Sequence, residues 1–251
     1  MHSNKNSIDL SIIIPALDEE KRIGDTLSDL ADYLKKDKLI AQLSVEIIVV
    51  SADSKDKTHD VVLSKKHLFE HFKFLTPGKR VGKGRDVKVG MLAATGNAVL
   101  FMDADEATPL FHIAEFYNLY LEGNEVVIGT RNLIAHHPNI IRRIISITGN
   151  IIFRIVGGLW VPDSQCGFKL FSYRAAQLCF NNLSIMGWGF DMEVLTIAQS
   201  NKIPLKCVQL IDWRDIPGGT FENKLIRNII SSLNDLRKIF INRVFSNYKF
   251  K

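Results

Sequence analysis

The sequence contains too few cysteines for a disulfide framework, and those present form no zinc motif. Cys166, Cys179 and Cys207 are widely spaced in 251 residues, without a CxxC pair or a nearby histidine. This pattern argues against a disulfide-rich secreted protein and favours a reducing compartment. The opening MHSNKNSID also lacks the apolar stretch of a secretion signal. We therefore expect a cytoplasmic protein.

The sequence also lacks a long apolar run without polar interruptions. The segment to test is IISITGNIIFRIVGGLWV, residues 144–161, which Asn150 and Arg154 interrupt. A charge near the centre of a membrane-spanning helix costs roughly 2.5–3.5 kcal/mol, so we interpret the segment as buried or interfacial. Its length alone leaves a spanning helix open as the alternative.

Two further features are missing. No GxGxxG opens the first crossover, and the glycines of GKGRDVKVG follow the third expected strand, which argues against a dinucleotide-dependent dehydrogenase. The charge imbalance is also small, because 32 Lys and Arg stand against 27 Asp and Glu, a net charge of +5. This excess suits phosphates or an anionic lipid surface as partners, and we expect no nucleic-acid partner.

The sequence has the composition and alternation of an α/β protein. Hydrophobic residues make up 46% and charged residues 24%, the balance of a folded globular chain. Continuous apolar runs alternate with amphipathic stretches, which predicts parallel strands connected by helices. Strands are expected at residues 12–14, 45–50, 72–75 and 98–102, and helices from Asp18 to about Leu34, from Thr58 onwards and through Met91.

Two regions are expected along the chain. Residues 8–220 form one large domain, and residues 221–251 form a tail. In the tail, apolar residues recur at helical spacing among lysines and arginines, which predicts a basic amphipathic helix. Such a helix can lie on an anionic membrane. Packing against its own domain, or against the second copy of a homodimer, is the open alternative.

The stretch VLFMDADEATP, residues 99–109, places two carboxylates at the end of an apolar strand. In an open α/β sheet, ligands gather at the carboxyl ends of the strands, where a turn would let Asp103 and Asp105 approach one cation. Such oxygen ligands suit Mg²⁺ or Mn²⁺, with water and substrate phosphate completing the coordination. The alternative is structural, with Asp105 capping the next helix.

Several segments between about residues 10 and 220 carry a family resemblance: SIIIPALDEE, EIIVVSADSKDKT, GKGRDVKVGML, VLFMDADEATP, VIGTRN, VPDSQCGFKLFSYRAA, GWGFDMEVLTIAQ and VQLIDWRDIPGG. Together they resemble family 2 glycosyltransferases of the GT-A fold, most closely dolichyl-phosphate β-glucosyltransferases, with polyprenyl-phosphate transferases as near relatives. The resemblance implies a Rossmann-like, mostly parallel central sheet flanked by helices. It also implies a metal-dependent hexosyltransferase.

The resemblance also implies a role for each matching residue. On the donor side it assigns Pro15 and Ala16 to the wall around the nucleotide base, Asp18 and Glu19 to an acidic pair, Lys83 to the diphosphate, Asp103 and Asp105 to the divalent ion, and Trp188, Asp191 and Glu193 to the sugar. On the acceptor side it assigns Arg131, Arg142 and Asn150 to the lipid phosphate, and Gln165 and Lys169 to the wall beside it. The candidate catalytic residues are Asp105, Arg131, Lys169 and Asp191.

The chain departs from the family after the second strand. Ser51-Ala52-Asp53-Ser54 replaces the usual Asp-Asp-Gly-Ser, so the carboxylate for the uracil N3–H is missing from its place. Asp53 is the candidate substitute, although a shift of one residue reverses a side chain's direction in an extended segment. The eukaryotic enzymes carry an amino-terminal anchor that this sequence lacks. We therefore expect a peripheral location on the cytoplasmic membrane face.

The expected reaction is attack by a polyprenyl or dolichyl phosphate on the anomeric carbon of a nucleoside-diphosphate sugar, preferably UDP-glucose, with inversion. A phosphate monoester has a second pKa of about 6, so the acceptor is already anionic and the site needs cations rather than a strong base. Two alternatives stay open. A transferase that extends a saccharide would need Asp191 or Glu193 as a base. A nucleotide-sugar binding protein without turnover would fit the Ser51-Ala52 departure.

Overall fold

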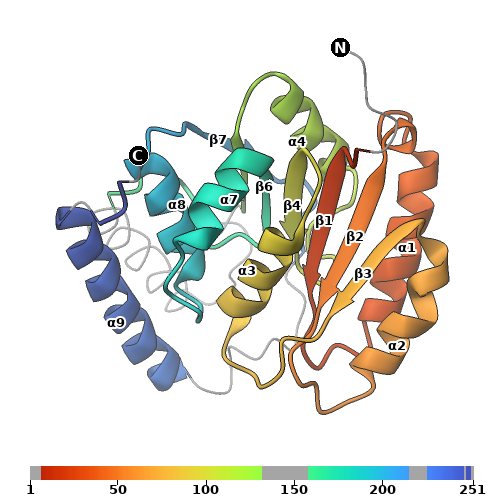
Figure 1. Ribbon diagram of the computed structural model, residues 1–251, viewed down its shortest axis with the longest axis horizontal. Coiled ribbons are helices and arrows are strands. Elements are labelled where there is room, and N and C mark those ends of the chain that lie inside the picture. Colours follow the sequence, from red (N-terminus) through yellow and green to blue (C-terminus); the bar gives the residue numbers. More distant parts are fainter. Residues whose placement is uncertain (1–6, 132–157, 215–224, 246, 250–251) are drawn as a thin grey trace.

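The computed structural model describes residues 7–131, 158–214, 225–245 and 247–249, with the backbone alone for residues 225–232. Its centre is a seven-stranded sheet in the order β3-β2-β1-β4-β6-β5-β7 (Figure 1). The strands are β1 (Leu10–Pro15), β2 (Val45–Val50), β3 (His71–Leu75), β4 (Ala98–Met102), β5 (Val126–Thr130), β6 (Phe168–Ser172) and β7 (Leu205–Gln209). β6 runs antiparallel to β4 and β5, and the other pairs are parallel. The expected mostly parallel sheet is confirmed.

Helices cover both faces of the sheet (Figure 1). One face packs against α3 (Lys83–Ala93), α7 (Tyr173–Asn181) and α8 (Phe190–Ser200), with α9 (Leu225–Val244) outside α8, and the other against α1 (Ile23–Lys36), α2 (Thr58–Lys65) and α4 (His112–Leu121). Short 3₁₀ turns occur at Ile40–Gln42 and Lys66–Leu68. Because side chains alternate along a strand, Ile13 enters the first core and Ile12 the second. This two-sided burial explains the continuous apolar runs.

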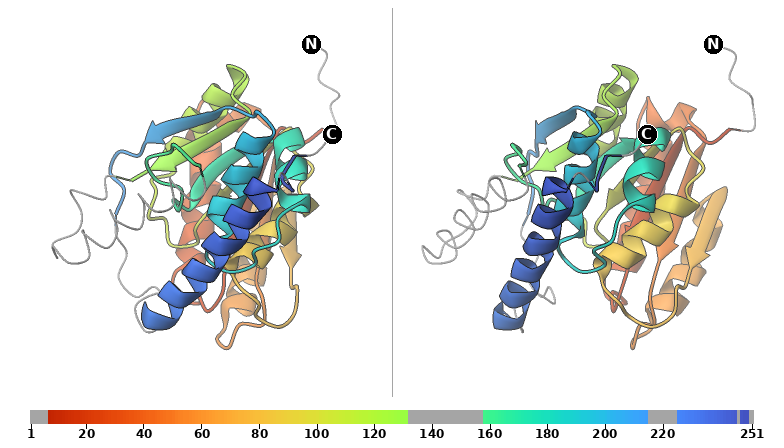
Figure 2. Two further views of the ribbon diagram at one scale, coloured as in Figure 1. Left: turned by 90° about the vertical axis from the view of Figure 1, so that its left-hand side faces the viewer. Right: turned by 60° about the vertical axis from the view of Figure 1, so that its left-hand side comes forward.

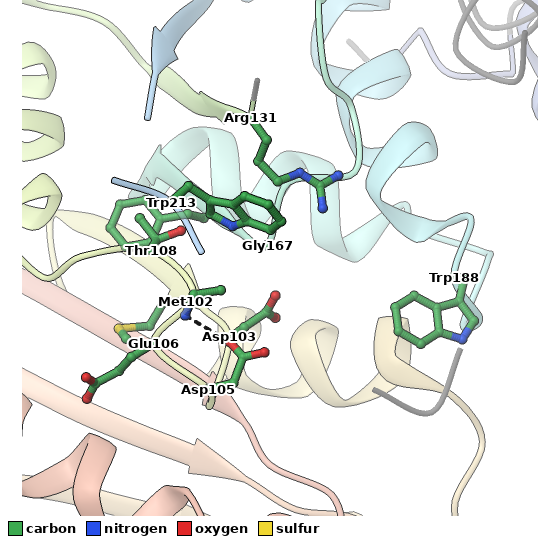
Figure 3. A pocket seen from close by; sticks show the side chains of 11 residues that line it. Met102, Asp103, Asp105, Glu106, Thr108, Arg131, Gly167, Trp188 and Trp213 are labelled. Carbon is green, nitrogen blue, oxygen red and sulfur yellow. Dashed lines mark hydrogen bonds between the residues drawn. The ribbon is translucent and has the colours of Figure 1, made fainter. Parts of the chain in front are cut away.

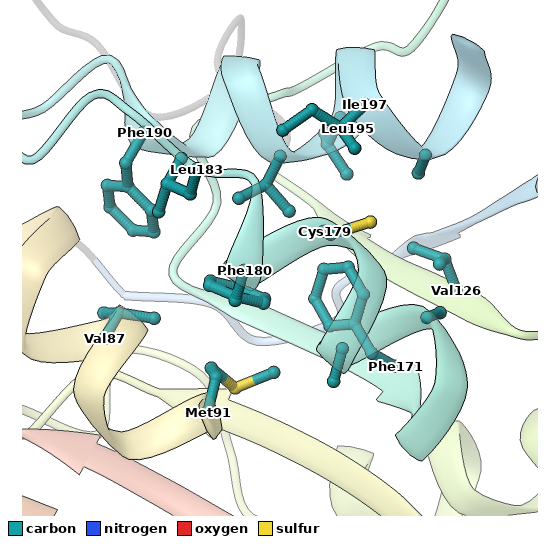
Figure 4. Close-up of a cluster of buried hydrophobic side chains, with 14 of the residues drawn as sticks. Val87, Met91, Val126, Phe171, Cys179, Phe180, Leu183, Phe190, Leu195 and Ile197 are labelled. Carbon is teal, nitrogen blue, oxygen red and sulfur yellow. The ribbon is translucent and has the colours of Figure 1, made fainter. Parts of the chain in front are cut away.

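The core on the α3 side joins four elements that support the site. Figure 4 shows Phe171 of β6 and Phe180 of α7 among side chains of α3 and α8. The Phe171 and Phe180 rings meet edge to face, with centroids 5.4 Å apart. This arrangement is favoured for aromatic pairs and adds to the hydrophobic stabilisation. The packing fixes the start of α3 relative to the start of α8.

The first helix begins later than expected. α1 starts at Ile23, whereas the sequence predicted a start at Asp18. Asp18 has a left-handed backbone, with φ of 57°, which a regular helix does not accept. The Glu19 amide donates to the Thr58 hydroxyl at 2.7 Å, a contact across 39 residues. The acidic residues before α1 therefore form a loop bound to the loop after β2.

The predicted tail contains a helix, α9, which packs on the first core through Leu236 and Ile239. Figure 2 shows it outside α8, at the edge of the molecule. In the described parts of the chain, no helix is both long and apolar enough to cross a membrane. Most of the segment tested for spanning, residues 144–157, lies outside the described residues. The division into a domain and a tail stays a prediction.

Candidate active site

A cavity of about 240 Å³ lies at the carboxyl end of β4, at the sheet edge where the sequence predicted ligands. It is lined by Met102, Asp103, Asp105, Glu106, Ala107, Thr108, Arg131, Gly167, Phe168, Trp188 and Trp213. Figure 3 shows Asp103 and Asp105 together on one side, Arg131 and Trp213 near them, and Trp188 at the far end. These residues come from five loops and strand ends, so only the folded chain assembles the cavity.

Asp103 is held between a cation and a glycine. The Lys83 Nζ atom, at the start of α3, lies 2.5 Å from Asp103 Oδ1. On the other side, a Cβ atom on Gly167 would lie 2.7 Å from Oδ1 and closer still to Oδ2, so the carboxylate fits only because residue 167 has no side chain. Burial acts to lower the pKa of Lys83, but the carboxylates of Asp103 and Asp191 outweigh it and raise this pKa. The ammonium group is therefore charged.

Asp105 lies beside Asp103 and does not cap a helix. Its Oδ1 atom accepts a hydrogen bond from the Ala107 amide at 3.1 Å, and α4 begins only at His112. Burial, followed by the charge of Asp103, raises the pKa of Asp105. Two neighbouring carboxylates repel each other, and a shared cation would relieve that repulsion.

The donor set fits a hard divalent ion that uses substrate oxygens. Asp103 and Asp105 offer carboxylate oxygens, the ligands that Mg²⁺ and Mn²⁺ prefer, and Asp103 already attracts the Lys83 ammonium. Within the described residues, no group of three or more His, Cys, Asp or Glu side chains could hold a metal by itself. Diphosphate oxygens or water would therefore have to complete the coordination.

Glu106 adds a carboxylate that the sequence analysis did not single out. Its backbone is left-handed, with φ of 53°, and Figure 3 shows its side chain directed away from Asp103 and Asp105. Its Oε1 atom is buried, with no hydrogen-bond partner among the described residues. Burial, followed by the charges of Asp29, Asp25 and Asp105, raises the pKa of Glu106 to about 7.

Arg131 is fixed by a partner that the sequence analysis also missed. Its Nε and Nη2 atoms donate to the Asp163 carboxylate at 2.6 and 3.0 Å, and its backbone amide donates at 3.2 Å. The guanidinium carbon lies 5.5 Å from the centroid of the Trp213 ring. Burial acts to lower the pKa of Arg131, but Asp163 outweighs it and raises this pKa. Both partners lie in segments that carry the family resemblance, which was the signal available.

Lys169 and Asp191 form an ion pair beneath the cavity. Lys169 is fully buried and its ammonium donates to Asp191 and, at 2.5 Å, to the Cys166 carbonyl. It also lies 5.1 Å from the Phe101 ring centroid. Burial raises the pKa of Asp191 despite Lys169. Neither side chain is among those that line the cavity, so both act from behind it.

Glu193 has a structural role, because its hydrogen bonds connect separate segments of the chain. It is fully buried, and its carboxylate accepts hydrogen bonds from the Ser184 hydroxyl at 2.6 Å, the Ile185 amide at 2.6 Å and the Tyr248 hydroxyl at 2.7 Å. These contacts occupy both carboxylate oxygens. Glu193 therefore connects the loop before α8 with the residues after α9.

The residues expected around the nucleotide base lie on the neighbouring loops of the same sheet edge. Pro15 ends β1 and Ala16 is buried, while Asp18 and Asp53 are exposed. The Asp18 carboxylate accepts from the Lys55 amide at 2.8 Å, which connects the loops after β1 and β2. The Asp53 backbone amide donates to the Gly78 carbonyl at 3.0 Å, and its side chain is exposed.

Gln165 and Glu19 are not among the described residues that line the cavity. Gln165 is exposed, and its backbone amide donates to Asp163 at 3.1 Å. Arg142 and Asn150 lie outside the described residues. Glu19 lies close enough for Asp103 and Asp105 to influence it, but burial is the main cause of its raised pKa, and its carboxylate pairs with Arg22 at 2.7 Å.

Comparison with known proteins finds relatives over most of the chain. Residues 11–180 match the family described as glycosyl transferase family 2. A dolichyl-phosphate β-glucosyltransferase of Trichomonas vaginalis is 32% identical over 248 residues, covering 95% of this chain and 75% of the relative. The human dolichyl-phosphate β-glucosyltransferase is 30% identical over 223 residues, covering 84% and 68%.

Solved structures of glucosyl-3-phosphoglycerate synthase from Mycobacterium tuberculosis share the fold. The complex with phosphoglyceric acid has a TM-score of 0.68 at 19% identity and covers 92% of this chain and 80% of the other. The complex with Mn²⁺ and UDP-glucose has a TM-score of 0.65 at 19% identity and covers 91% and 79%. At this identity the similarity establishes the fold alone.

Proposed function

Because this chain belongs to glycosyl transferase family 2, we propose that it transfers glucose from UDP-glucose to a dolichyl or polyprenyl phosphate. The observation that carries the proposal is the carboxylate pair of Asp103 and Asp105 in a cavity that also contains Arg131. The sugar and the acceptor are supported by the relatives, whose names give both. Inversion at the anomeric carbon is part of the proposal.

In this proposal, Asp103 and Asp105 would hold the divalent ion. When bound, Mg²⁺ or Mn²⁺ would supply Lewis-acid stabilisation of the leaving diphosphate. Lys83 already contacts Asp103 and carries a second positive charge to the same place. Arg131 offers a planar fork to phosphate oxygens, and Asp163 fixes the direction of that fork. Cations held in this way bring two anionic substrates together.

The two buried carboxylates that could act as a general base are already paired or hydrogen-bonded, which favours a phosphate acceptor over a sugar hydroxyl. A hydroxyl needs a general base, for which Asp191 and Glu193 were the candidates. Asp191 is paired with Lys169, and both oxygens of Glu193 accept hydrogen bonds. A phosphate acceptor is itself anionic and requires no base.

The outward face of α9 supports a peripheral location on the cytoplasmic side of a membrane. Its exposed apolar side chains are Leu233, Phe240, Ile241 and Val244, and the exposed Phe245 follows directly after its end. Arg237, Lys238 and Arg243 are exposed among them, and residues 233–245 expose no Asp or Glu. Apolar residues with flanking cations suit the interface of an anionic bilayer, where the proposed acceptor resides.

A transfer assay tests the proposed function. The protein, radiolabelled UDP-glucose, Mn²⁺ and a polyprenyl phosphate should yield a lipid-extractable product that mild acid cleaves. Asp105→Asn should lower activity roughly a hundredfold or more, because a bound metal contributes several kcal/mol. Asp32→Asn is the matched control, since Asp32 is exposed on α1 and forms an ion pair with the exposed Lys36.

The assay also distinguishes the alternatives. Full activity of Asp105→Asn would contradict the assignment of the metal. Tight UDP binding in calorimetry, without product from any acceptor, would instead indicate a nucleotide-sugar binding protein. An acid-stable product would indicate a transferase that extends a saccharide.

A further inference from the structure

The loop that carries Trp188 is bound to the C-terminal helix. A Cβ atom on Gly189 would lie 2.7 Å from both Cβ and Oδ2 of Asp235, so loop and helix touch with no room for a side chain between them. The Gly189 backbone amide favours the charged form of the Asp235 carboxyl, although burial outweighs this effect and raises the pKa of Asp235. Asp235 is only 8% exposed although α9 lies at the edge of the molecule. Its carboxylate is therefore directed at the loop and away from solvent.

The same loop is bound to the start of α3. A Cβ atom on Gly84 would lie 2.9 Å from the Ile185 carbonyl oxygen, and the Arg85 amide donates to the Met186 carbonyl at 3.2 Å. Lys83 is the first residue of α3 and lies next to this contact. Its Nζ atom is 5.5 Å from the centroid of the Trp188 ring. The loop is thus held between α3, which carries Lys83, and α9, which carries Asp235.

We infer that Asp235 is a positioning residue for the donor pocket, and that it keeps Trp188 over Lys83 by holding Gly189. The inference rests on the proposed function for its kinetic readout. It makes α9 part of the transferase site although the family match ends at residue 180. Without the carboxylate, Gly189 keeps its neighbour Cβ at residue 235 but loses Cγ and Oδ2, so Trp188 is held less firmly beside Lys83. A displacement of about 1 Å near reacting groups can cost a hundredfold in rate.

The experiment compares three variants of the full chain. Asp235→Ala removes the hydrogen-bond acceptor, Asp235→Asn keeps a side-chain oxygen that can accept the Gly189 N–H, and Asn234→Ala changes an exposed neighbour on α9. We expect Asp235→Ala to lower kcat/KM for UDP-glucose by about tenfold to a hundredfold, with the thermal midpoint nearly unchanged. The Asn variant should keep most of the activity, and Asn234→Ala should keep all of it.

A second readout does not depend on turnover. The contribution of Trp188 to the fluorescence is obtained by difference from the matching Trp188→Phe protein, and its quenching by acrylamide is measured. We expect stronger quenching of Trp188 in Asp235→Ala only. If the wild-type chain transfers no glucose but this change in quenching occurs, the proposed function fails and the positioning role stands.

The inference is overturned if Asp235→Ala leaves both the kinetics and the quenching unchanged. Equal impairment of the Asn variant also overturns it, since the amide oxygen can still accept the hydrogen bond. If Asp235→Ala does not fold, Gly189→Ala tests the same contact from the loop side. The added methyl group would push the loop from α9 and should reproduce the change in Trp188 quenching.

Discussion

Asp103 has little free space around its carboxylate in the cavity. Its carboxylate contacts Lys83 on one side and occupies the place of a Cβ atom at Gly167 on the other, so the space admits no further carbon. The Arg131 side chain is similarly fixed by a bidentate ion pair with Asp163. These side chains are placed by direct contacts, so small changes of volume at their neighbours should have large effects on binding.

Gly167→Ala should displace the Asp103 carboxylate and weaken binding of Mn²⁺ with UDP. The reason is steric, because the new methyl group would occupy the position of the carboxylate oxygens. We expect a loss of roughly tenfold to a hundredfold in Mn²⁺-dependent UDP affinity, measured by calorimetry. Gly24→Ala on α1 is the control, since its methyl group meets only the side chains of Val61 and Lys65. Unchanged affinity in Gly167→Ala would contradict the metal assignment.

Glu46 provides a test of stability against pH. Its carboxylate, 2% exposed, accepts from Ser11 and the Thr95 amide at 2.6 Å and contacts Lys73 at 2.9 Å. Burial acts to raise the pKa of Glu46, but these hydrogen bonds outweigh it and lower the pKa below its ordinary value of 4.5. A depressed carboxyl pKa stabilises the fold fully above that value, and the stabilisation is lost as the pH falls through the folded-state pKa.

Glu46→Gln should therefore lower the free energy of unfolding by about 1–3 kcal/mol at neutral pH, because the new amide N–H₂ faces donors. The difference from the wild-type protein should shrink as the pH falls below about 4.5. Urea unfolding across this range measures it. Glu70→Gln is the control, since that side chain is 90% exposed and should show no such trend. A difference that grows towards acid pH would contradict the assigned direction.

At the scale of elements, α9 has apolar side chains both on its inward face and on its outward face. The inward face packs Leu236 and Ile239 into the core on the α3 side, and Asp235 reaches the Trp188 loop from the same side. The outward face leaves Phe240 and Phe245 48% and 72% exposed. A helix of a globular protein usually has one apolar stripe, so the second stripe requires its own explanation.

The double variant Phe240→Ser/Phe245→Ser should lose binding to vesicles that contain phosphatidylserine while its fold and its activity on a short-chain, water-soluble acceptor are kept. Burial of apolar area and the cations of α9, each worth about 1 kcal/mol near an anionic surface, both drive binding. Vesicle sedimentation at low and high salt measures it. Leu63→Ser, at a 52% exposed site on α2, is the control.

Two results would contradict the membrane assignment. One is unchanged vesicle binding in the double variant. The other is a halved mass in solution for the double variant, which would show that the outward face joins two copies of the chain. Leu236→Ala should have the opposite effect, a less stable fold with vesicle binding kept, because a buried leucine on the inward face stabilises the fold. It should cost about 2–5 kcal/mol of unfolding free energy.

At the scale of the whole molecule, the sheet brings the loop ends into one cavity. β1, β2 and β4 are parallel neighbours, so the loops that follow them leave the same edge. The antiparallel β6 then starts at that edge and delivers Gly167 beside Asp103. The cavity itself is lined by residues between Met102 and Trp213, so segments far apart in the sequence share any energy gained when a ligand binds there.

UDP and Mn²⁺ together should raise the thermal midpoint more than the sum of their separate effects, because each completes the binding site of the other. A ligand at one hundred times its Kd adds about 2.7 kcal/mol to the unfolding free energy. Differential scanning fluorimetry measures the shift, with GDP as the control for base choice. In Asp103→Asn the Mn²⁺-dependent part should disappear. An equal shift with GDP would contradict the preference for uridine.

The sequence by itself determined β1 to β4, their parallel arrangement and the carboxylates at the end of β4, whereas β5, β6 and β7 were not predicted. These features have local causes, since apolar runs and a DAD motif involve neighbours along the chain, and the family resemblance supplied the chemistry. β2 and β4 lie at the residues expected for them.

Only the tertiary structure decided which side chains meet. Arg131 pairs with Asp163 across 32 residues, Gly167 makes room for Asp103, and Asp235 reaches Gly189 from another helix. A different contact, between Glu19 and Thr58, binds the loop before α1, which starts only at Ile23. Lys169 pairs with Asp191 and does not line the cavity. Such pairings depend on how strands and loops are arranged in space, and no periodicity or spacing along the chain encodes them.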